Sequence, residues 1–295
     1  MVMRYVCAVL LGVLAAGPAL AQTPAPAAQG QSAAGGQVAP ASDEFRPRLP
    51  SYFGDTGFWF VPTADVLKKG GFSTSLFHAK SHTRQGLLGV DEIGVTAAVG
   101  LTDRVELFGS YRAAGVDRNV RPIFTSPAHV GGVSLNYPFV NRYWSQLLYG
   151  PLTVGAKFNA LSQARGAGLS LAPRVLVELP TGQEAISSGI VKTHIDLIAS
   201  GEAGRKIELS GVVGLILRPD ADPFELSNGL TWGVGTSFPS RAPVRVLLEA
   251  QGERVFNHVR VGSAGFRAID GSLAPTETAP ANPVNLKLGL VLQPT

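Results

Sequence analysis

The stretch that decides the fold is GLTDRVELFGSYR, residues 100–112. After a short turn, small and apolar residues alternate with polar ones, which is the period-two pattern of a β-strand with two unlike faces. One face would carry Val105, Leu107, Gly109 and Tyr111. In a soluble sandwich this face would contact a core, whereas in a membrane barrel it would contact lipid and the charged face would line a lumen. The rest of the chain indicates whether the protein is a soluble sandwich or a membrane barrel.

The first 21 residues have the features of a secretory signal peptide. One positive charge precedes an apolar run that is too short to span a membrane as a helix, and an Ala-Leu-Ala motif follows. We expect cleavage between Ala21 and Gln22. The only cysteine, Cys7, lies within this segment, so the mature chain is expected to form no disulfide.

Residues 22–50 are expected to form a disordered leader. They are rich in Ala, Pro, Gln and Gly and carry almost no bulky apolar side chain, so they cannot bury enough surface to offset the entropy of ordering. Residues 51–295 are then expected to form one folded unit. The chain carries 25 Lys and Arg against 21 Asp and Glu. Because the basic residues are scattered singly, they predict no nucleic-acid-binding surface.

The folded part is expected to be all-β, because its apolar residues alternate and no continuous apolar run is long enough for a membrane helix. The short motif LTD between two alternating segments predicts a tight hairpin. We predict about 12 antiparallel strands, with about 10 to 14 allowed, closed into a transmembrane barrel. The alternating segments are residues 56–61, 72–80, 92–101, 105–112, 130–137, 152–160, 169–179, 191–202, 206–218, 229–238, 244–253, 259–269 and 285–293.

Charges of both signs lie on one face of nearly every predicted strand, and the opposite faces carry almost none. The uncharged faces mix Val and Leu with Gly and Ala, and aromatic residues gather near strand ends as an interfacial girdle requires. Both features favour a membrane barrel over a soluble sandwich. The residues predicted to line the lumen are Glu92, Arg104, Glu106, Arg112, Lys157, Arg174, Glu178, Lys192, His194, Asp196, Lys206, Glu208, Arg245, Glu249 and Lys287.

Two roles for these charges stay open at this point. They fill a narrow lumen with ion pairs and hydrogen bonds, or they line a polar pathway for a solute. A barrel of about 12 strands lies between small barrels filled by side chains and wide porins with an aqueous channel. Phe108 is an aromatic residue on the polar face, and it either plugs the lumen or marks a bulge.

Five motifs, in this order along the chain, resemble bacterial outer-membrane β-barrel proteins. They are GLTDRVELFGSYR (residues 100–112), LTVGAKFNAL (152–161), VELPTGQ (177–183), IVKTHIDLIAS (190–200) and GLTWGVGTSFPSRAPVRVLLEAQGE (229–253). The chain looks most like the barrel part of OmpA-family proteins. It is more loosely similar to the outer-membrane transporters grouped with the phenol-degradation meta-pathway proteins. The resemblance extends over residues 51–293.

The resemblance implies an outer-membrane location, contact with outer-membrane lipid, and a role as a channel or as a structural protein of the envelope. It implies no particular ligand. Many OmpA-family members carry a peptidoglycan-binding domain after the barrel, whereas this chain stops at LVLQPT, which makes peptidoglycan binding doubtful. The oligomeric state is not set by the sequence.

The sequence predicts no catalytic, metal or cofactor site. His194 and Asp196 share a strand face, but the five histidines are scattered and lack the ligand spacing of zinc sites. Serines that follow glycines form no Gly-x-Ser-x-Gly elbow, and the Gly-rich segments lack the spacing of a dinucleotide-binding loop. We therefore expect no enzyme activity and no cofactor.

The leading functional hypothesis is a passive channel for small solutes. A barrel that stabilises the envelope without conducting is the first alternative, and a soluble periplasmic β protein is the second. Arginine substitutions are expected to separate the two faces. At Leu209 or Leu215 arginine should cost about 2–4 kcal/mol at the bilayer midplane, whereas the lumen position Ser210 should tolerate it.

Overall fold

The computed structural model describes residues 49–83, 88–118, 135, 146–261, 277–278 and 282–292. All of them belong to the unit Asp43–Thr295. The expected signal peptide, its cleavage position and nearly all of the expected leader lie outside the described residues.

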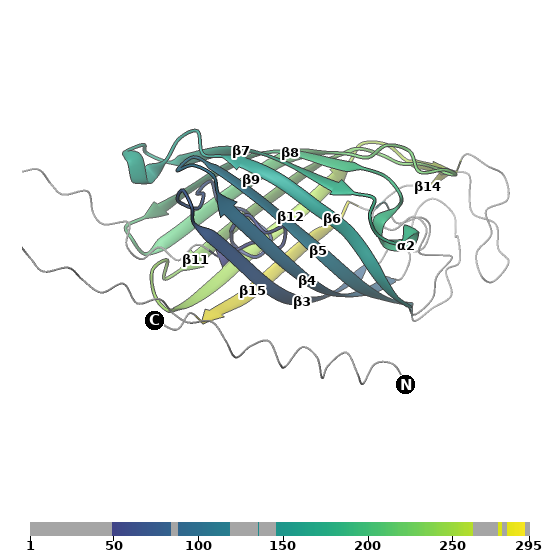
Figure 1. Cartoon of the computed structure of the whole chain (residues 1–295), viewed down its shortest axis with the longest axis horizontal. Coiled ribbons are helices and arrows are strands. Elements are labelled where there is room, and N and C mark those ends of the chain that lie inside the picture. The colour runs from purple at the N-terminus through teal and green to yellow at the C-terminus, as the bar shows by residue number, and fades with distance from the viewer. Residues whose placement is uncertain are drawn as a thin grey trace, which may run out of the picture. The chain divides into compact units, whose positions relative to one another are not determined.

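Ten antiparallel strands form one curled sheet (Figure 1). This arrangement confirms the prediction of an all-β, antiparallel fold, because each strand of the sheet pairs with its neighbour in the chain. In order across the sheet, the strands are β3 (Phe72–Thr83), β4 (Leu88–Gly100), β5 (Val105–Arg118), β6 (Gln146–Phe158), β7 (Ser170–Leu179), β8 (Lys192–Ala203), β9 (Ile207–Leu217), β11 (Gly229–Phe238), β12 (Val244–Val255) and β15 (Val284–Leu292).

The remaining elements are short. A two-stranded hairpin and a three-stranded sheet lie outside the ten-stranded sheet, and two connections contain single helical turns. No helix in the described part of the chain is long and apolar enough to cross a membrane. The short strands are β1 (Leu49–Pro50), β2 (Thr56–Gly57), β10 (Phe224–Glu225), β13 (Val259–Val261) and β14 (Glu277–Thr278), and the turns are η3 (Gln163–Arg165) and α2 (Glu184–Ser187).

Three segments expected to be barrel strands contribute no described strand to the ten-stranded sheet. Within residues 56–61, only Thr56–Gly57 forms a strand, and it pairs with β1. β5 and β6 pair directly, and within 130–137 only Leu135 lies among the described residues. In the segment 259–269, the described strand Val259–Val261 belongs to the small sheet with β10 and β14. The sheet has ten strands among the described residues, at the lower limit of the expected range of about 10 to 14, and no pairing among these residues closes it into a barrel.

The direct pairing of β5 with β6 also places the long connections. β5 ends and β6 begins at the end of the sheet opposite the turn 101–104, so the connection 119–145 starts and ends there. The connection 256–283, between β12 and β15, starts and ends at the same end of the sheet as the connection 119–145. The tight turns 101–104, 204–206 and 239–243 lie at one end, together with the longer connection 159–169, and the connections after β5 and β12 lie at the other. We call the first the short-turn end and the second the long-connection end.

The apolar face of the strands points away from the curve of the sheet and is exposed. In β9, Leu209 and Leu215 are 52% and 41% exposed, whereas Glu208 and Ser210 on the opposite face are buried. The stretch 100–112 follows the same rule, because Leu107 and Tyr111 are exposed while Glu106 and Arg112 are buried. This distribution is the reverse of that in a soluble protein, where apolar side chains fill the core.

Residues 49–71, here called the inner segment, lie within the curve of the sheet, in dark purple in Figure 1. The segment passes into β3 through Gly70, whose φ of 74° lies in the left-handed region that glycine adopts readily. Gly70 N donates to Gly100 O at 2.8 Å, and Gly100 N donates to Gly71 O at 2.9 Å. The segment therefore enters the sheet at its short-turn end.

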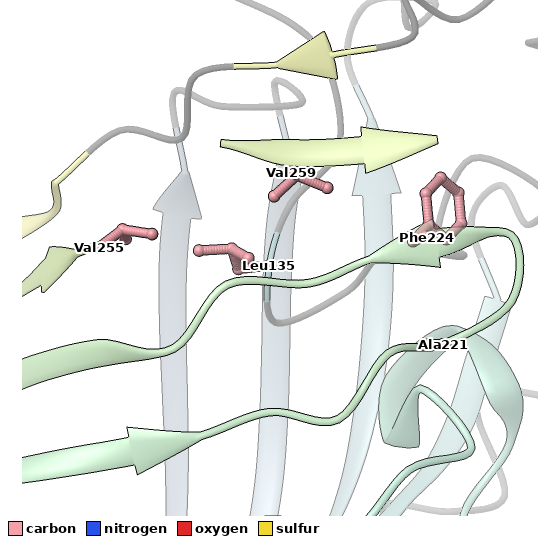
Figure 2. Packing of buried hydrophobic residues seen from close by; sticks show 5 residues of the cluster. All are labelled: Leu135, Ala221, Phe224, Val255 and Val259. Carbon is pink, nitrogen blue, oxygen red and sulfur yellow. The ribbon is translucent and has the colours of Figure 1, made fainter. Parts of the chain in front are cut away.

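At the opposite end, residues from several long connections form an apolar cluster (Figure 2). Phe224 of β10 and Val259 of β13 pack there against Leu135 of the connection 119–145. The end of β12 contributes Val255, and Ile190 packs against the cluster from the connection before β8. The long connections are therefore packed against one another.

We predict that cysteines placed at Ser110 and Thr153 crosslink under mild oxidation, because these residues lie directly opposite each other on β5 and β6. Cysteines at Ser110 and Val154 are the control, since successive side chains point to opposite faces of a sheet. Mobility on non-reducing gels measures the disulfide. A strand inserted between β5 and β6 would keep Ser110 and Thr153 apart. Failure of the two cysteines to crosslink would therefore contradict the described pairing.

Candidate functional site

The candidate site is the contact between the inner segment and the polar face of the sheet, and Asp55 lies at its centre. The Asp55 side chain is fully buried. Lys157 Nζ of β6 lies 3.3 Å from Asp55 Oδ2, and Arg174 Nη1 of β7 lies 3.1 Å from the same oxygen. Ser51 Oγ donates to Asp55 Oδ1 at 2.5 Å. One carboxylate of the inner segment thus holds two cations of the sheet.

Further carboxylates complete this buried network. Lys157 Nζ lies 3.3 Å from Glu106 Oε1, and Arg174 Nη2 lies 2.7 Å from Asp196 Oδ2. The side chains of Lys157, Asp55 and Glu106 have no exposed surface. Buried charges are tolerated only when they are paired and hydrogen-bonded, and each of these five groups meets that condition.

The electrostatic consequence is clearest at Asp55. Burial alone would raise the pKa of the Asp55 carboxyl, but the Arg174 guanidinium and the Lys157 ammonium outweigh it and hold this pKa below its ordinary value. We call the inner segment docked when it is bound to the inner face of the sheet as in this structure. Because the pKa of Asp55 is lowered in the docked state, its charge stabilises this state at every pH above the ordinary pKa of the carboxyl. This stabilisation is lost as the pH falls through the lowered pKa. Asp55 is therefore ionised in the docked state at neutral pH.

Two glutamates of the sheet bind the backbone of the inner segment. Glu249 of β12 accepts hydrogen bonds from three consecutive N–H groups, those of Trp59 at 3.1 Å, Phe60 at 2.8 Å and Val61 at 2.7 Å. Glu106 of β5 accepts from the N–H groups of Thr56 and Leu67, both at 2.8 Å, and from Thr56 Oγ1 at 2.6 Å. Charge-assisted bonds of this kind are among the stronger hydrogen bonds in proteins.

Uncharged groups on the same face bind the rest of the segment backbone. Ser200 Oγ accepts from Ala64 N at 2.9 Å, and Asn159 Nδ2 donates to Ala64 O at 2.7 Å. Ser210 Oγ donates to Pro62 O at 2.5 Å. Because Ser210 is buried against the inner segment, an arginine there would displace the segment. The tolerance of this position for arginine stays a prediction, and the burial of Ser210 against the segment argues against it.

Tyr52 anchors the start of the segment. Its hydroxyl donates to Glu92 Oε2 at 2.6 Å and accepts a hydrogen bond from Arg112 Nη1. The Arg112 guanidinium also lies over the Tyr52 ring, 5.0 Å from its centroid. Phe60 stacks on the ring at 5.1 Å, and Phe77 of β3 lies at the same centroid distance. Tyr52 therefore joins the polar network to an aromatic cluster.

Apolar side chains on the polar face of the sheet also contact the segment. Phe108 and Leu176 form a buried cluster with Ala98, against which Phe53 and Leu67 of the inner segment pack. Phe108 therefore lies on the inner face of the sheet in a cluster packed by the inner segment. It marks no bulge, because the register shift between β5 and β6 falls between Tyr111 and Ala113.

Similar contacts continue around the sheet. Leu247 of β12 forms a buried cluster with Phe58 and Val61, and Ile198 of β8 forms one with Ala64. Inward-facing apolar residues on β5, β7, β8 and β12 thus meet apolar residues of the inner segment.

A second group of charges lies toward the long-connection end. Arg218 at the end of β9 binds Glu253 of β12, with Nη1 2.7 Å from Oε1. Glu178 of β7 lies 3.2 Å from Arg112 Nη2 and 3.3 Å from His194 Nε2. The inner face thus carries two groups of paired polar side chains, one around Asp55 and one nearer the long-connection end.

The structure places all but two of the residues predicted to line the lumen on the inner face of the sheet. Glu208 and Arg245 are buried there beside the residues already described, and Lys192 and Lys287 lie on the same face of their strands. The two remaining residues, Arg104 and Lys206, are exposed in the short turns 101–104 and 204–206. The sequence prediction missed Tyr52 and Asp55, which belong to the inner segment.

Other site chemistries are not evident on this face. No group of three or more His, Cys, Asp or Glu side chains is placed to hold a metal ion within the described residues. The site is therefore described by its ion pairs and by its contacts to the backbone of the inner segment.

Comparisons with known proteins add little to this geometry. No protein-family model matches the sequence, and no curated protein matches it. Among solved structures, the chain is similar to an outer membrane channel from Pseudomonas putida F1, with a TM-score of 0.49 and 11% sequence identity over 77% of this chain and 84% of that chain. This TM-score does not establish a shared fold, so the function of that channel is not carried over.

We predict that Asp55→Asn weakens docking of the inner segment, because it leaves Lys157 and Arg174 without their shared carboxylate. Removing one partner of a buried ion pair costs about 3–5 kcal/mol. Hydrogen–deuterium exchange measures the effect as faster exchange of the amides of residues 56 and 59–61. Asp91→Asn is the matched control, since Asp91 pairs with His78 at the exposed end of β4. Equal exchange in the two variants would contradict the role given to Asp55.

Proposed function

We propose that the protein is an outer-membrane β-barrel channel for small solutes whose lumen is closed by its own inner segment. The observation that carries the proposal is the complete burial of Lys157, Asp55 and Glu106. In a water-filled channel, charged side chains that point into the lumen are accessible to water. Here they contact residues 49–71 instead.

The membrane location is supported by the outward face of the sheet. Exposed leucines, valines and isoleucines alternate with buried polar residues along β8, β9 and β12, while charges of both signs point inward. An exposed apolar surface of this extent is unfavourable in water and favourable in hydrocarbon. The narrower likeness to the OmpA family stays a prediction.

The contacts of the inner segment suit a displaceable closure. Much of its binding depends on carboxylate, hydroxyl and amide groups that bond to backbone N–H and C=O groups. Water replaces such partners when the segment leaves, so that neither the backbone nor the charged lumen is left without hydrogen bonds. The vacated lumen would be lined by the mixed charges predicted from the sequence and would have weak ion selectivity.

A barrel that supports the envelope without conducting is the second candidate. The same observation favours it, because a lumen filled by paired charges and apolar contacts stabilises the barrel from within. The two candidates differ in whether the inner segment ever leaves. Neither candidate assigns an enzyme activity or a cofactor to the chain.

We predict that a disulfide between Ala64→Cys and Ser200→Cys abolishes conductance reversibly. Ala64 N and Ser200 Oγ lie 2.9 Å apart, so the disulfide would fix the inner segment to β8. Single-channel recording in planar bilayers, with Cys7 replaced if it is retained, would show no openings under oxidation and brief openings after reduction. The parent protein would also open briefly, and Asp55→Asn would open more often.

The control is the Ser110→Cys and Thr153→Cys pair, which joins two strands and leaves the inner segment free. Its conductance should not depend on the redox state. Steady current through the oxidised Ala64–Ser200 variant would refute closure by the inner segment. Silence from every folded variant, Asp55→Asn included, would favour the non-conducting barrel.

We predict that Val213→Arg destabilises the folded protein in lipid vesicles by about 2–4 kcal/mol, because Val213 is exposed on the outward face near the middle of β9. Leu217→Arg, at the end of the same strand, should cost only about 0–1 kcal/mol, as expected near a membrane interface. Urea titration of the refolded protein measures the difference. Equal costs at the two positions, or a folded monomer in detergent-free buffer, would contradict the membrane location.

A further inference from the structure

The two edge strands of the sheet, β3 and β15, are each paired on one side only. β3 pairs with β4 and β15 pairs with β12, and no pairing joins β3 to β15 among the described residues. The strands run in opposite directions, because the ten strands of the sheet alternate in direction. The direction of the chain therefore permits closure, but the structure shows a seam between these strands.

The exposure of outward side chains marks the same seam. Leu288 of β15 is 78% exposed, whereas Leu248, its direct partner on β12, is 53% exposed. At the other edge, Leu76 of β3 is 61% exposed, compared with 47% for its partner Val95 on β4. Both edge strands therefore lack a neighbour that would cover these side chains.

On one side of the seam, the inner segment is held by β12 and β15. The Glu249 carboxylate of β12 binds the N–H groups of Trp59, Phe60 and Val61. Lys287 of β15, which lies directly opposite Glu249 in the sheet, places its ammonium over the Phe60 ring. Charge-assisted hydrogen bonds and a cation–π contact thus fix residues 59–61 to this edge.

On the other side of the seam, the same segment is held by β3 and β4. Phe60 stacks on Tyr52, and Tyr52 contacts Phe77 of β3. The Tyr52 hydroxyl donates to Glu92 of β4 at 2.6 Å. A continuous line of contacts therefore runs from Glu249 through Phe60 and Tyr52 to β3 and β4.

We propose that the inner segment is the closing element of the barrel, a clasp that joins β12 and β15 to β3 and β4 across the seam in place of a β-ladder. Trp59, Phe60 and Tyr52 form this clasp, and Glu249 is its main anchor. Release of residues 59–61 from Glu249 opens the seam. The proposal rests on the membrane location proposed above, and it gives the lumen a lateral opening toward the bilayer in addition to its two ends.

The clasp acts at the two strand edges, whose backbone groups need hydrogen-bond partners in a membrane. An unpaired strand edge in hydrocarbon leaves N–H and C=O groups without partners, which costs several kcal/mol for each group. Contacts of the clasp link the two edges from within. Loss of the clasp would expose both edges at once, and opening would therefore be brief.

The test measures the distance across the seam. Spin labels on Leu76→Cys and Leu288→Cys, both outward-facing, report the separation of β3 and β15 in lipid vesicles by pulsed electron resonance. With Glu249 intact we expect one narrow distribution. Glu249→Gln should add a second component at longer distance, because it removes the charge that binds three N–H groups.

Glu253→Gln is the matched control, since Glu253 lies on the same face of β12 and binds Arg218 instead of the inner segment. It should leave the narrow distribution unchanged. Phe60→Ala is a second variant, which breaks the aromatic line without altering a carboxylate, and it should reproduce the longer component. Resistance to SDS unfolding before heating confirms that each variant is folded.

Two results would overturn the clasp. One is a seam distance that stays unchanged in both Glu249→Gln and Phe60→Ala. The other is an equal increase in Glu253→Gln, which would show general loosening of β12. The distance between the labels does not depend on ion flow. If no conductance is recorded but the distance increases in the Glu249→Gln variant, the proposed channel function is refuted and the clasp is supported.

Discussion

The burial of Asp55 between Lys157 and Arg174 is the interaction on which the rest of the structure depends. A curled sheet that turns its apolar face outward must place its charges inside, where no bulk solvent compensates them. Two cations from the sheet meet one carboxylate from a different part of the chain, and Glu106 and Asp196 each pair with one of these cations. Breaking one member of such a set leaves another charge buried without a partner, which is far more costly than losing an exposed ion pair. The inner segment is therefore bound to the inner face of the curled sheet by paired, buried charges.

Strand periodicity was sufficient to predict the class of fold and the orientation of most strand residues. In β8, Lys192, His194 and Asp196 lie on the inner face as their alternation indicates. The strand count was overestimated because residues 56–61 and 259–269 also contain apolar residues in short runs. Periodicity reports that a segment has two unlike faces, but it does not report which partner the segment pairs with. That partner is set by contacts between distant parts of the chain.

The inner segment itself was missed for the same reason. Glu249 and Glu106 bind backbone N–H groups of the segment, and a backbone group leaves no trace in the sequence. The sequence does contain one indication of a segment bound to the inner face. Apolar residues interrupt the polar faces of four strands, at Phe108, Leu176, Ile198 and Leu247. Each of these apolar residues lies in a buried cluster with the inner segment or with residues packed against it. An apolar residue that recurs on the polar faces of successive strands therefore indicates a segment bound inside a barrel.

The short junction between the inner segment and β3 has a kinetic consequence. Gly70 and Gly71 join them directly, and both glycines are hydrogen-bonded to Gly100 at the turn between β4 and β5. If the segment is displaced as proposed, it stays covalently attached to β3, which begins at Phe72, and its return is an intramolecular step. Short tethers of this kind give effective concentrations on the order of millimolar. A soluble competitor for the lumen would have to exceed that concentration, or bind much more tightly, to keep the barrel open.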